Sequence, residues 1–295
     1  MIDATLPSTP AMIGRGIGAM ILAAALYSVS DALIKWLASA YPTAEIVFWR
    51  QIFALLPIIP ALWRGGWTAI RTNRPFGQIG RALTGAGALL GFYYCYRTMP
   101  LADVFGISFA APLFVTALSV PILGEHVGWR RWSAVGIGFA GVLLMVQPGT
   151  GLFGPATWIA LLATLLYALS LVFIRDLSRT ESTISIVFFA TLTIGCISGA
   201  MMPFQWVTPR GSDMILLGVA GILGGMGQLA AAHAFRLAPA AVVAPFDYSA
   251  LLYTALIGYA VWGDLPAPLF LCGALIVIAS GLYIFHRETR PASYI

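Results

Sequence analysis

The chain contains ten apolar stretches, and each is close to the ~20 residues that a helix needs to cross the hydrocarbon core of a bilayer. Hydrophobic residues make up 60% of the sequence and charged residues only 9%, whereas a soluble domain carries about 25% charged residues. These features predict an integral membrane protein. The expected spans are 16–37, 43–63, 78–97, 101–121, 130–147, 155–176, 183–204, 213–235, 240–262 and 267–285.

The pattern within the stretches favours helices over strands. Strands of a membrane barrel alternate apolar and polar residues with a period of two, and runs such as "GALLGFYYCY" and "LLGVAGILGG" do not. The intervals between the stretches are short and leave no room for a domain outside the membrane. We therefore expect an all-α membrane protein.

The second half of the sequence repeats the first. Shifting Leu26–Trp49 by 140 residues gives nine identities in 24 positions, and "LYSVSDALIK" at Leu26 is matched by "LYALSLVFIR" at Leu166. After one deletion the shift becomes 139, and it then aligns Arg97–Glu125 with its copy. The chain is therefore interpreted as a duplication, with one five-helix repeat at 14–148 and a second at 149–287.

Five helices is an odd number, so the second repeat must enter the membrane upside down. Inverted repeats are a common architecture of secondary transporters, whose substrate site lies near the bilayer midplane between the repeats. Tyr27 and Tyr167 are equivalent residues near the middle of their helices. We expect them to lie together beside a central cavity.

Basic residues predict the orientation, because cytoplasmic loops collect Arg and Lys. A cytoplasmic N-terminus puts twelve basic residues on the inner side and three on the outer side. The net charge of +5 is spread as such topology signals and not as a stripe that would bind nucleic acid. We expect a multi-pass protein of the inner (plasma) membrane with both termini in the cytoplasm. The inner set is Arg15, Arg64, Arg71, Arg74, Arg81, Arg130, Arg131, Arg175, Arg179, Arg236, Arg287 and Arg290, and the outer set is Lys35, Arg97 and Arg210.

Motifs for nucleotide hydrolysis and metal chemistry are absent from the sequence. It contains neither GxxxxGK[ST] nor HExxH, its three cysteines form no CxxC, and its three histidines are scattered. We therefore predict no enzyme activity, no metal and no cofactor. An intramembrane enzyme and a receptor are kept as the alternatives from other functional classes.

Three motifs carry a resemblance to a known family. "FWRQIFA" lies in the second stretch, "ILGEHVGWRRWSAVGIGFAGVLL" follows the fourth, and "VWGDLP" is a degraded copy in the second half, with Asp264 where the motif usually has Glu. Together with the duplication, they resemble the EamA-type exporters of the drug/metabolite transporter superfamily, and among these the exporters of aromatic and other amino acids. The resemblance implies a secondary transporter that exports small organic solutes, with export of other metabolites or drugs as the alternative.

Charged residues occur within the first two stretches, where they are costly and usually face protein or a cavity. Counting from the turn near Ala40 places Asp31 level with Arg50 and Lys35 level with Glu45. These four residues are predicted to form charge pairs. They are either structural salt bridges or an outer gate, with Arg50 as a candidate for holding a substrate carboxylate.

Asp247 is the deepest acid of the second half, beside Pro245 and level with Gln228 of the preceding stretch. The two side chains could bind a substrate ammonium or a proton, or could simply join two helices. Aromatic and polar positions that align between the repeats are either core or cavity lining. The predicted substrate-binding set is Tyr27, Ser30, Tyr94, Phe109, Tyr167, Gln228, His233, Asp247 and Tyr248.

Small residues line faces of the fifth and tenth stretches, in "GIGFAGVLL" and "GALIVIASGL". Such faces allow two helices to approach closely. We expect them to pack within one chain, which predicts a monomer, with a homodimer as the alternative. The expected partners are a small-molecule substrate and the lipid bilayer.

Overall fold

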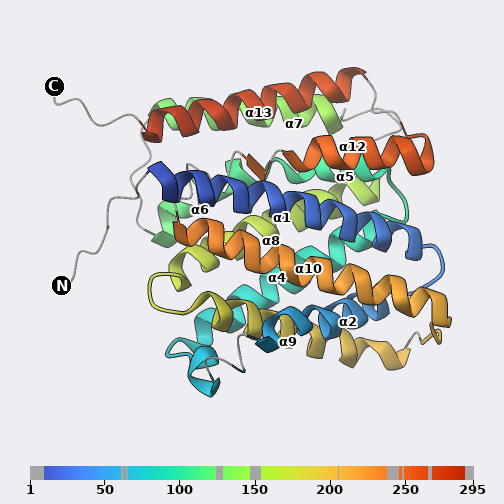
Figure 1. Cartoon of the computed structure of the whole chain (residues 1–295). Helices are drawn as coiled ribbons and strands as arrows, with labels where there is room; N and C mark the ends of the chain where they lie inside the picture. The colour runs from blue at the N-terminus through green and yellow to red at the C-terminus, as the bar shows by residue number, and fades with distance from the viewer. Residues whose placement is uncertain are drawn as a thin grey trace.

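The computed structural model describes residues 10–60, 63, 66–123, 129–146, 154–204, 206–237, 246–247, 249–264 and 268–289, and these contain helices and turns but no strand. Figure 1 shows the helices lying side by side in one bundle. Their bounds are α1 (Pro10–Leu37), α2 (Thr43–Ala54), α4 (Pro75–Cys95), α5 (Leu101–Ser108), α6 (Ala111–Leu123), α7 (Trp129–Val146), α8 (Pro155–Leu177), α9 (Thr183–Met201), α10 (Gly211–Leu237), α12 (Ser249–Trp262) and α13 (Pro268–Thr289). Short 3-10 helices are η1 (Leu56–Ile58), η2 (Gly66–Ile70) and η3 (Met202–Phe204).

The helix starts follow local sequence signals. α4 and α8 each begin with a proline, Pro75 and Pro155, whose missing N–H would have no partner in the first turn. α9 follows Ser182, whose side chain accepts a hydrogen bond from the backbone N–H of Ser185. These signals place the turns near the predicted ends of the apolar stretches.

Five spans of the described chain are long and apolar enough to cross a membrane: Ala11–Leu37, Asp103–Ile122, Pro155–Leu177, Thr183–Met201 and Gly211–Leu237. Large apolar side chains also point outward, with Leu252 67% and Leu275 65% exposed. Contiguous apolar surface of this kind suits a lipid environment. The structure therefore agrees with a multi-pass membrane protein, and the count of ten spans stays a prediction.

Three of the predicted stretches differ from single continuous helices, and one of them is 240–262, in which α12 begins only at Ser249. The stretch 101–121 is divided into α5 and α6 by a turn at Phe109 and Ala110. In the stretch 43–63, α2 ends at Ala54, a 3-10 helix that contains Pro57 follows, and α-helix resumes at Ile59. Proline has no N–H to donate to the preceding turn, so it interrupts an α-helix that reaches it.

The two halves of the chain pack in exchanged pairs. α1 packs on α10 and α4 packs on α8, so the first helix of each half contacts the third helix of the other half. The second helices follow the same rule, because α2 contacts α10 and α9 contacts α4. α7 and α13 pair with each other along one edge, and α2 and α9 meet at the opposite edge (Figure 1). This exchange is what a twofold relation between the halves requires.

One pair of hydrogen bonds shows the exchange at the level of single residues. The Ser30 hydroxyl donates to the carbonyl of Ala220 at 2.9 Å, and the Ser170 hydroxyl donates to the carbonyl of Arg81 at 3.4 Å. Ser170 is the copy of Ser30 at a shift of 140, and Ala220 is the copy of Arg81 at a shift of 139. The repeat in the sequence is thus also a repeat of contacts.

The two halves also run in opposite directions. Tyr93, near the end of α4, donates a hydrogen bond to Asp31 near the end of α1, so α1 and α4 point toward the same face. Arg74, just before α4, pairs with Asp176 at the end of α8. α8 therefore points toward the face where α4 begins, opposite to α1. The arrangement is that of an inverted repeat.

The glycine faces of α7 and α13 pack against each other within the chain. A Cβ added to Gly141 would lie 2.8 Å from the carbonyl oxygen of Gly273 and 3.0 Å from Ile276. At Gly138 it would meet Leu113 and Ser280. Glycine is needed here because the two backbones approach so closely, and this use agrees with packing inside one chain.

Candidate functional site

Arg50 of α2 lies at the centre of the contact between the two halves. Its side chain is only 3% exposed, and its Nη1 donates to Oε1 of Gln51 at 3.0 Å. The guanidinium lies against α10 at Gly224, where an added Cβ would overlap it. The glycine thus provides the space for a large buried cation.

Tyr93 connects Arg50 to Asp31. The guanidinium carbon of Arg50 lies 5.8 Å from the centre of the Tyr93 ring, and the Tyr93 hydroxyl donates to Oδ1 of Asp31 at 3.3 Å. Tyr96 packs beside Tyr93 with ring centres 5.4 Å apart. The expected pair of Asp31 and Arg50 is therefore brought together through a tyrosine, and the two side chains form no direct ion pair in the described part of the chain.

Tyr27 and Tyr167 lie near the same charges. The Tyr27 hydroxyl interacts electrostatically with Arg50, Arg81 and Asp247, and the Tyr167 hydroxyl with Tyr27 and Asp247. The Tyr27 ring lies against α10, where a Cβ on Gly227 would be 3.0 Å away. The structure thus gathers both tyrosines and Asp247 around one region, as the symmetry of the sequence suggests.

The pairing expected for Lys35 is wrong. Its ammonium group binds Asp264, the residue just after α12, at 3.0 Å and lies 4.7 Å from the centre of the Trp262 ring. Glu45 is buried and accepts a hydrogen bond from the backbone N–H of Val207 at 3.1 Å instead. Both partners come from the second half of the chain, so counting from the turn near Ala40 could not find them.

The remaining predicted residues are not all brought to this region. Tyr94 is 46% exposed, and His233 is exposed on α10. Phe109 is buried at the turn between α5 and α6, and the Ser30 hydroxyl is used in packing α1 on α10. Gln228 is half-buried and makes no hydrogen bond with Asp247 within the described ranges. Tyr248, Pro245 and Glu125 lie outside the described residues.

Each face of the bundle carries a polar clamp between the halves. At one face, which we name the Tyr41 clamp, the Tyr41 hydroxyl donates to Oδ2 of Asp213 at 2.6 Å and accepts from the backbone N–H of Arg210 at 3.1 Å. The clamp ties the turn after α1 to the start of α10. The carboxylate of Asp213 raises the pKa of Tyr41, because it accepts the phenol proton in a hydrogen bond.

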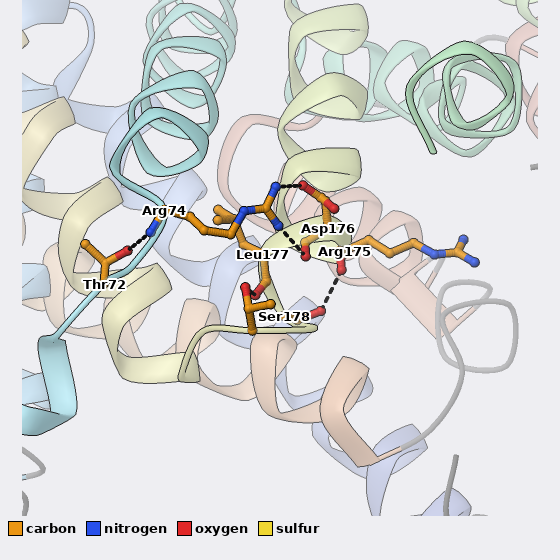
Figure 2. A network of polar contacts seen from close by, with 7 residues as sticks. Thr72, Arg74, Arg175, Asp176, Leu177 and Ser178 are labelled. Carbon is orange, nitrogen blue, oxygen red and sulfur yellow. Dashed lines mark hydrogen bonds and ion pairs between the residues drawn. The ribbon is translucent and has the colours of Figure 1, made fainter. Parts of the chain in front are cut away.

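The Arg74 clamp lies at the other face. Nη2 of Arg74 binds Oδ2 of Asp176 at 2.6 Å and Nη1 reaches the Asp176 carbonyl at 3.3 Å, while Arg175 points away from the pair (Figure 2). The backbone N–H of Asn73 donates to Glu181 at 3.1 Å. Glu181 is the copy of Tyr41 in the repeat, so equivalent turns hold equivalent helix starts. The Asp176 carboxylate raises the pKa of Arg74.

Sequence reasoning missed several buried polar residues. Arg81, counted among the basic residues of the cytoplasmic side, lies six residues inside α4 and is 7% exposed. Gln51, Gln78 and Tyr93 are buried too. A signal was present, since Gln78 and Arg81 are three residues apart and therefore share a helix face. No group of three metal-binding side chains gathers among the described residues.

The comparisons with known proteins agree on a class of function. The chain is 28% identical to the S-adenosylmethionine uptake transporter of Rickettsia felis, over 94% of this chain and 95% of that protein. It is 28% identical to the riboflavin transporter of Rhizobium johnstonii, over 92% and 91% of the two chains. It is 27% identical to the pseudopaline exporter CntI of Pseudomonas aeruginosa, over 91% and 95%. These relatives are small-molecule transporters, and none of the three is named for amino acids.

A solved structure described as "Crystal structure of protein" has the same fold. It superposes with a TM-score of 0.68 at 17% identity, and the match covers 94% of this chain and 99% of that one. The model of the EamA-like transporter family matches the chain twice, at residues 14–147 and 155–285. The chain is therefore a small-molecule transporter that belongs to the EamA-like transporter family.

Proposed function

We propose that this chain is a secondary exporter of small organic solutes, chiefly amino acids and their derivatives with an aromatic ring, by alternating access. The observation that carries the proposal is the buried group of Arg50, Tyr93 and Asp31 at the contact between the halves. A guanidinium suits a carboxylate, a carboxylate suits an ammonium, and Tyr27 and Tyr167 supply ring surface.

The solutes of the relatives support this substrate class. S-adenosylmethionine combines an α-amino-acid group with an aromatic base, and riboflavin contains a fused aromatic ring system. A site with opposite charges beside tyrosine rings fits such molecules better than it fits simple ions. Relatives named for uptake and for export match the same part of the chain, so we attribute the direction of transport to the solute gradient and propose export as the direction in cells.

The proposal includes the arrangement in the membrane. We propose ten spans in two halves, 14–148 and 149–287, around a central cavity in the plasma (inner) membrane, with both termini in the cytoplasm. The close packing of α7 on α13 within one chain supports a monomer. Export of other metabolites or drugs is the runner-up, and it predicts transport without dependence on the α-amino-acid group.

A flux assay tests the function. Purified protein is reconstituted into liposomes, and efflux of labelled L-tryptophan, L-phenylalanine, L-alanine, S-adenosylmethionine and riboflavin is measured with and without a pH gradient. We expect protein-dependent flux of the ring-bearing amino acids or of S-adenosylmethionine. Flux of none of the five solutes would contradict the proposal, and flux of riboflavin alone would favour the runner-up.

Three variants assign roles within the site. Tyr27→Ala and Tyr167→Ala should lower L-tryptophan flux several-fold more than L-alanine flux, because only the larger solute loses ring contacts. Asp247→Asn should lower the flux of every solute that carries an ammonium group. Tyr94→Ala is the matched control, since Tyr94 points outward and should change neither flux. An equal loss across all solutes, normalised to folded protein, would mean that the tyrosines only pack helices.

A further inference from the structure

Arg81 is a buried cation without an acidic partner. Its Nη1 donates to the carbonyl of Ile186 on α9 at 2.9 Å, and its Nε has no hydrogen-bond partner. No carboxylate lies within ion-pair distance of it among the residues that the structure describes. Burying an unpaired charge is costly, so such groups are usually paired or bind a ligand.

Arg50, at the equivalent contact, also has a side-chain donor without a hydrogen-bond partner. Its Nε is unpartnered, and so is Nε2 of the neighbouring Gln51. Arg50 belongs to the contact between α2 and α10, and Arg81 to the contact between α4 and α9, which the exchange of halves makes equivalent. Each of these two contacts therefore carries one guanidinium with an unused donor.

The two guanidinium groups lie at different depths. Arg50 is seven residues from the start of α2, about 10 Å from the face of the Tyr41 clamp. Arg81 is six residues from the start of α4, about 9 Å from the face of the Arg74 clamp. The Tyr27 hydroxyl lies within electrostatic range of both arginines. A solute crossing the protein would meet one guanidinium in each half of the membrane.

Gln78, the neighbour of Arg81, indicates which groups of a solute would bind beside the guanidinium. Oε1 of Gln78, one turn earlier on the same face of α4, is a buried acceptor without a partner. An unused donor and an unused acceptor one turn apart on the same helix face match a carboxylate and an adjacent ammonium. The pair at Arg50 and Gln51 offers two donors and matches the carboxylate alone.

We propose that Arg81 and Gln78 form a second binding site for the α-amino-acid group of the solute, and that during export they hold this group first, on the way from the Arg74 face, before Arg50 does. The proposal rests on the proposed function and adds a residue and a substrate group to it. Arg81 binds the carboxylate and Gln78 accepts from the ammonium. The aromatic part of the solute stays beside Tyr27 during the transfer.

Three probes that share an indole ring test this second binding site. L-tryptophan has both groups, tryptamine lacks the carboxylate, and indole-3-propionate lacks the ammonium. Flux of each in liposomes, and the rise in melting temperature of the purified protein that each causes, are measured for the wild type and for Arg81→Gln, Arg81→Lys, Gln78→Leu and the exposed control Arg71→Gln.

Arg81→Gln should lower L-tryptophan flux about tenfold or more, since a hydrogen bond between charged groups is lost. The flux of tryptamine, and the rise in melting temperature that it causes, should change less than twofold. Arg81→Lys should recover part of the loss. Gln78→Leu should lower the flux of L-tryptophan and leave the flux of indole-3-propionate unchanged. This variant keeps the test valid if Arg81→Gln does not fold. Arg71→Gln should match the wild type.

Equal losses for L-tryptophan and tryptamine, or no loss for either, would overturn the second binding site and leave the proposed function intact. A wild type that transports tryptamine but not L-tryptophan would also overturn it, because no carboxylate would then be recognised. A wild type without flux of any solute in the earlier panel would refute the proposed function itself.

Discussion

The contact between α2 and α10 and its equivalent between α9 and α4 show how one fold accommodates two different sequences. In the first, the large residue Arg50 lies on the second helix of its half, and glycines on α10 make room for it. In the second, the copy of Arg50 is Ala190, and the large residue is Arg81 on the third helix. The duplication conserves which helices meet, while the residues that fill each contact diverge.

The glycines of α10 and their copies on α4 show that the spacing between helices differs at the two contacts. Gly221, Gly224 and Gly225 on α10 correspond to Ala82, Gly85 and Ala86 on α4. A Cβ on Gly225 would lie 2.5 Å from the carbonyl oxygen of Ala54, whereas a Cβ on Gly85 would meet only ordinary contacts at 3.5 Å. The backbones of α2 and α10 therefore approach more closely than this position of α4 approaches its neighbours.

Among the variants that test this difference, replacement of Gly225 should lower the stability of the protein the most. Gly225→Ala gives α10 the residue that α4 already has, but its Cβ meets backbone atoms that cannot move aside. We expect a loss of about 1–3 kcal/mol of stability, typical of an overpacked contact. The melting temperature of the purified protein measures it.

Gly85→Ala, one residue before the copy of Gly225, is the control at the equivalent contact. It adds the same methyl group to a helix where there is room, so it should be neutral or stabilise by up to about 1 kcal/mol through helix propensity. Equal destabilisation by Gly85→Ala and Gly225→Ala would show that the two contacts have the same spacing.

Variants of the two clamps should have a smaller effect, and they test whether the two faces of the bundle open independently. Asp176→Asn weakens a partly exposed ion pair, and Asp213→Asn replaces the charged acceptor of the Tyr41 hydroxyl with a neutral amide. Exposed pairs contribute about 0.2–1 kcal/mol, so each variant should raise amide hydrogen exchange by a few-fold at its own face only. Exchange is read in peptides covering residues 72–80 and 206–214. Faster exchange at both faces in either variant would show that the clamps open together.

The sequence predicted the parts of this architecture that depend on length and repetition. Most of the apolar stretches match the helices to within a few residues. The exceptions are the 3-10 helix after Ala54, the turn at Phe109 and the stretch 240–262, where α12 begins only at Ser249. The copy of Tyr27 at Tyr167 indicated a cavity shared by the two rings, and this role of the tyrosines stays a prediction. Periodicity and duplication are properties of one chain read along its length, so a sequence contains them directly.

Contacts across the halves could not be predicted in the same way. Counting from a turn gives the depth of a residue in the membrane but not the face of the helix that it occupies. Lys35 and Glu45 are at matching depths, yet they turn to Asp264 and Val207 of the other half. Arg81 was counted among the basic residues of the cytoplasmic side because an arginine near a helix start resembles a topology signal. Only the packing of α4 on α9 distinguishes a buried arginine from an arginine that marks the cytoplasmic side.

The inversion of the two halves is tested most directly by labelling equivalent turns. Ala40 and Thr180 occupy the same position in the two repeats, and both are exposed. Each is changed to cysteine in a variant that lacks Cys95, Cys196 and Cys272, and a membrane-impermeant maleimide is applied to intact cells and to permeabilised cells. We predict labelling of Ala40→Cys on intact cells and of Thr180→Cys only after permeabilisation. Labelling of both on intact cells, or of neither, would contradict the inverted repeat.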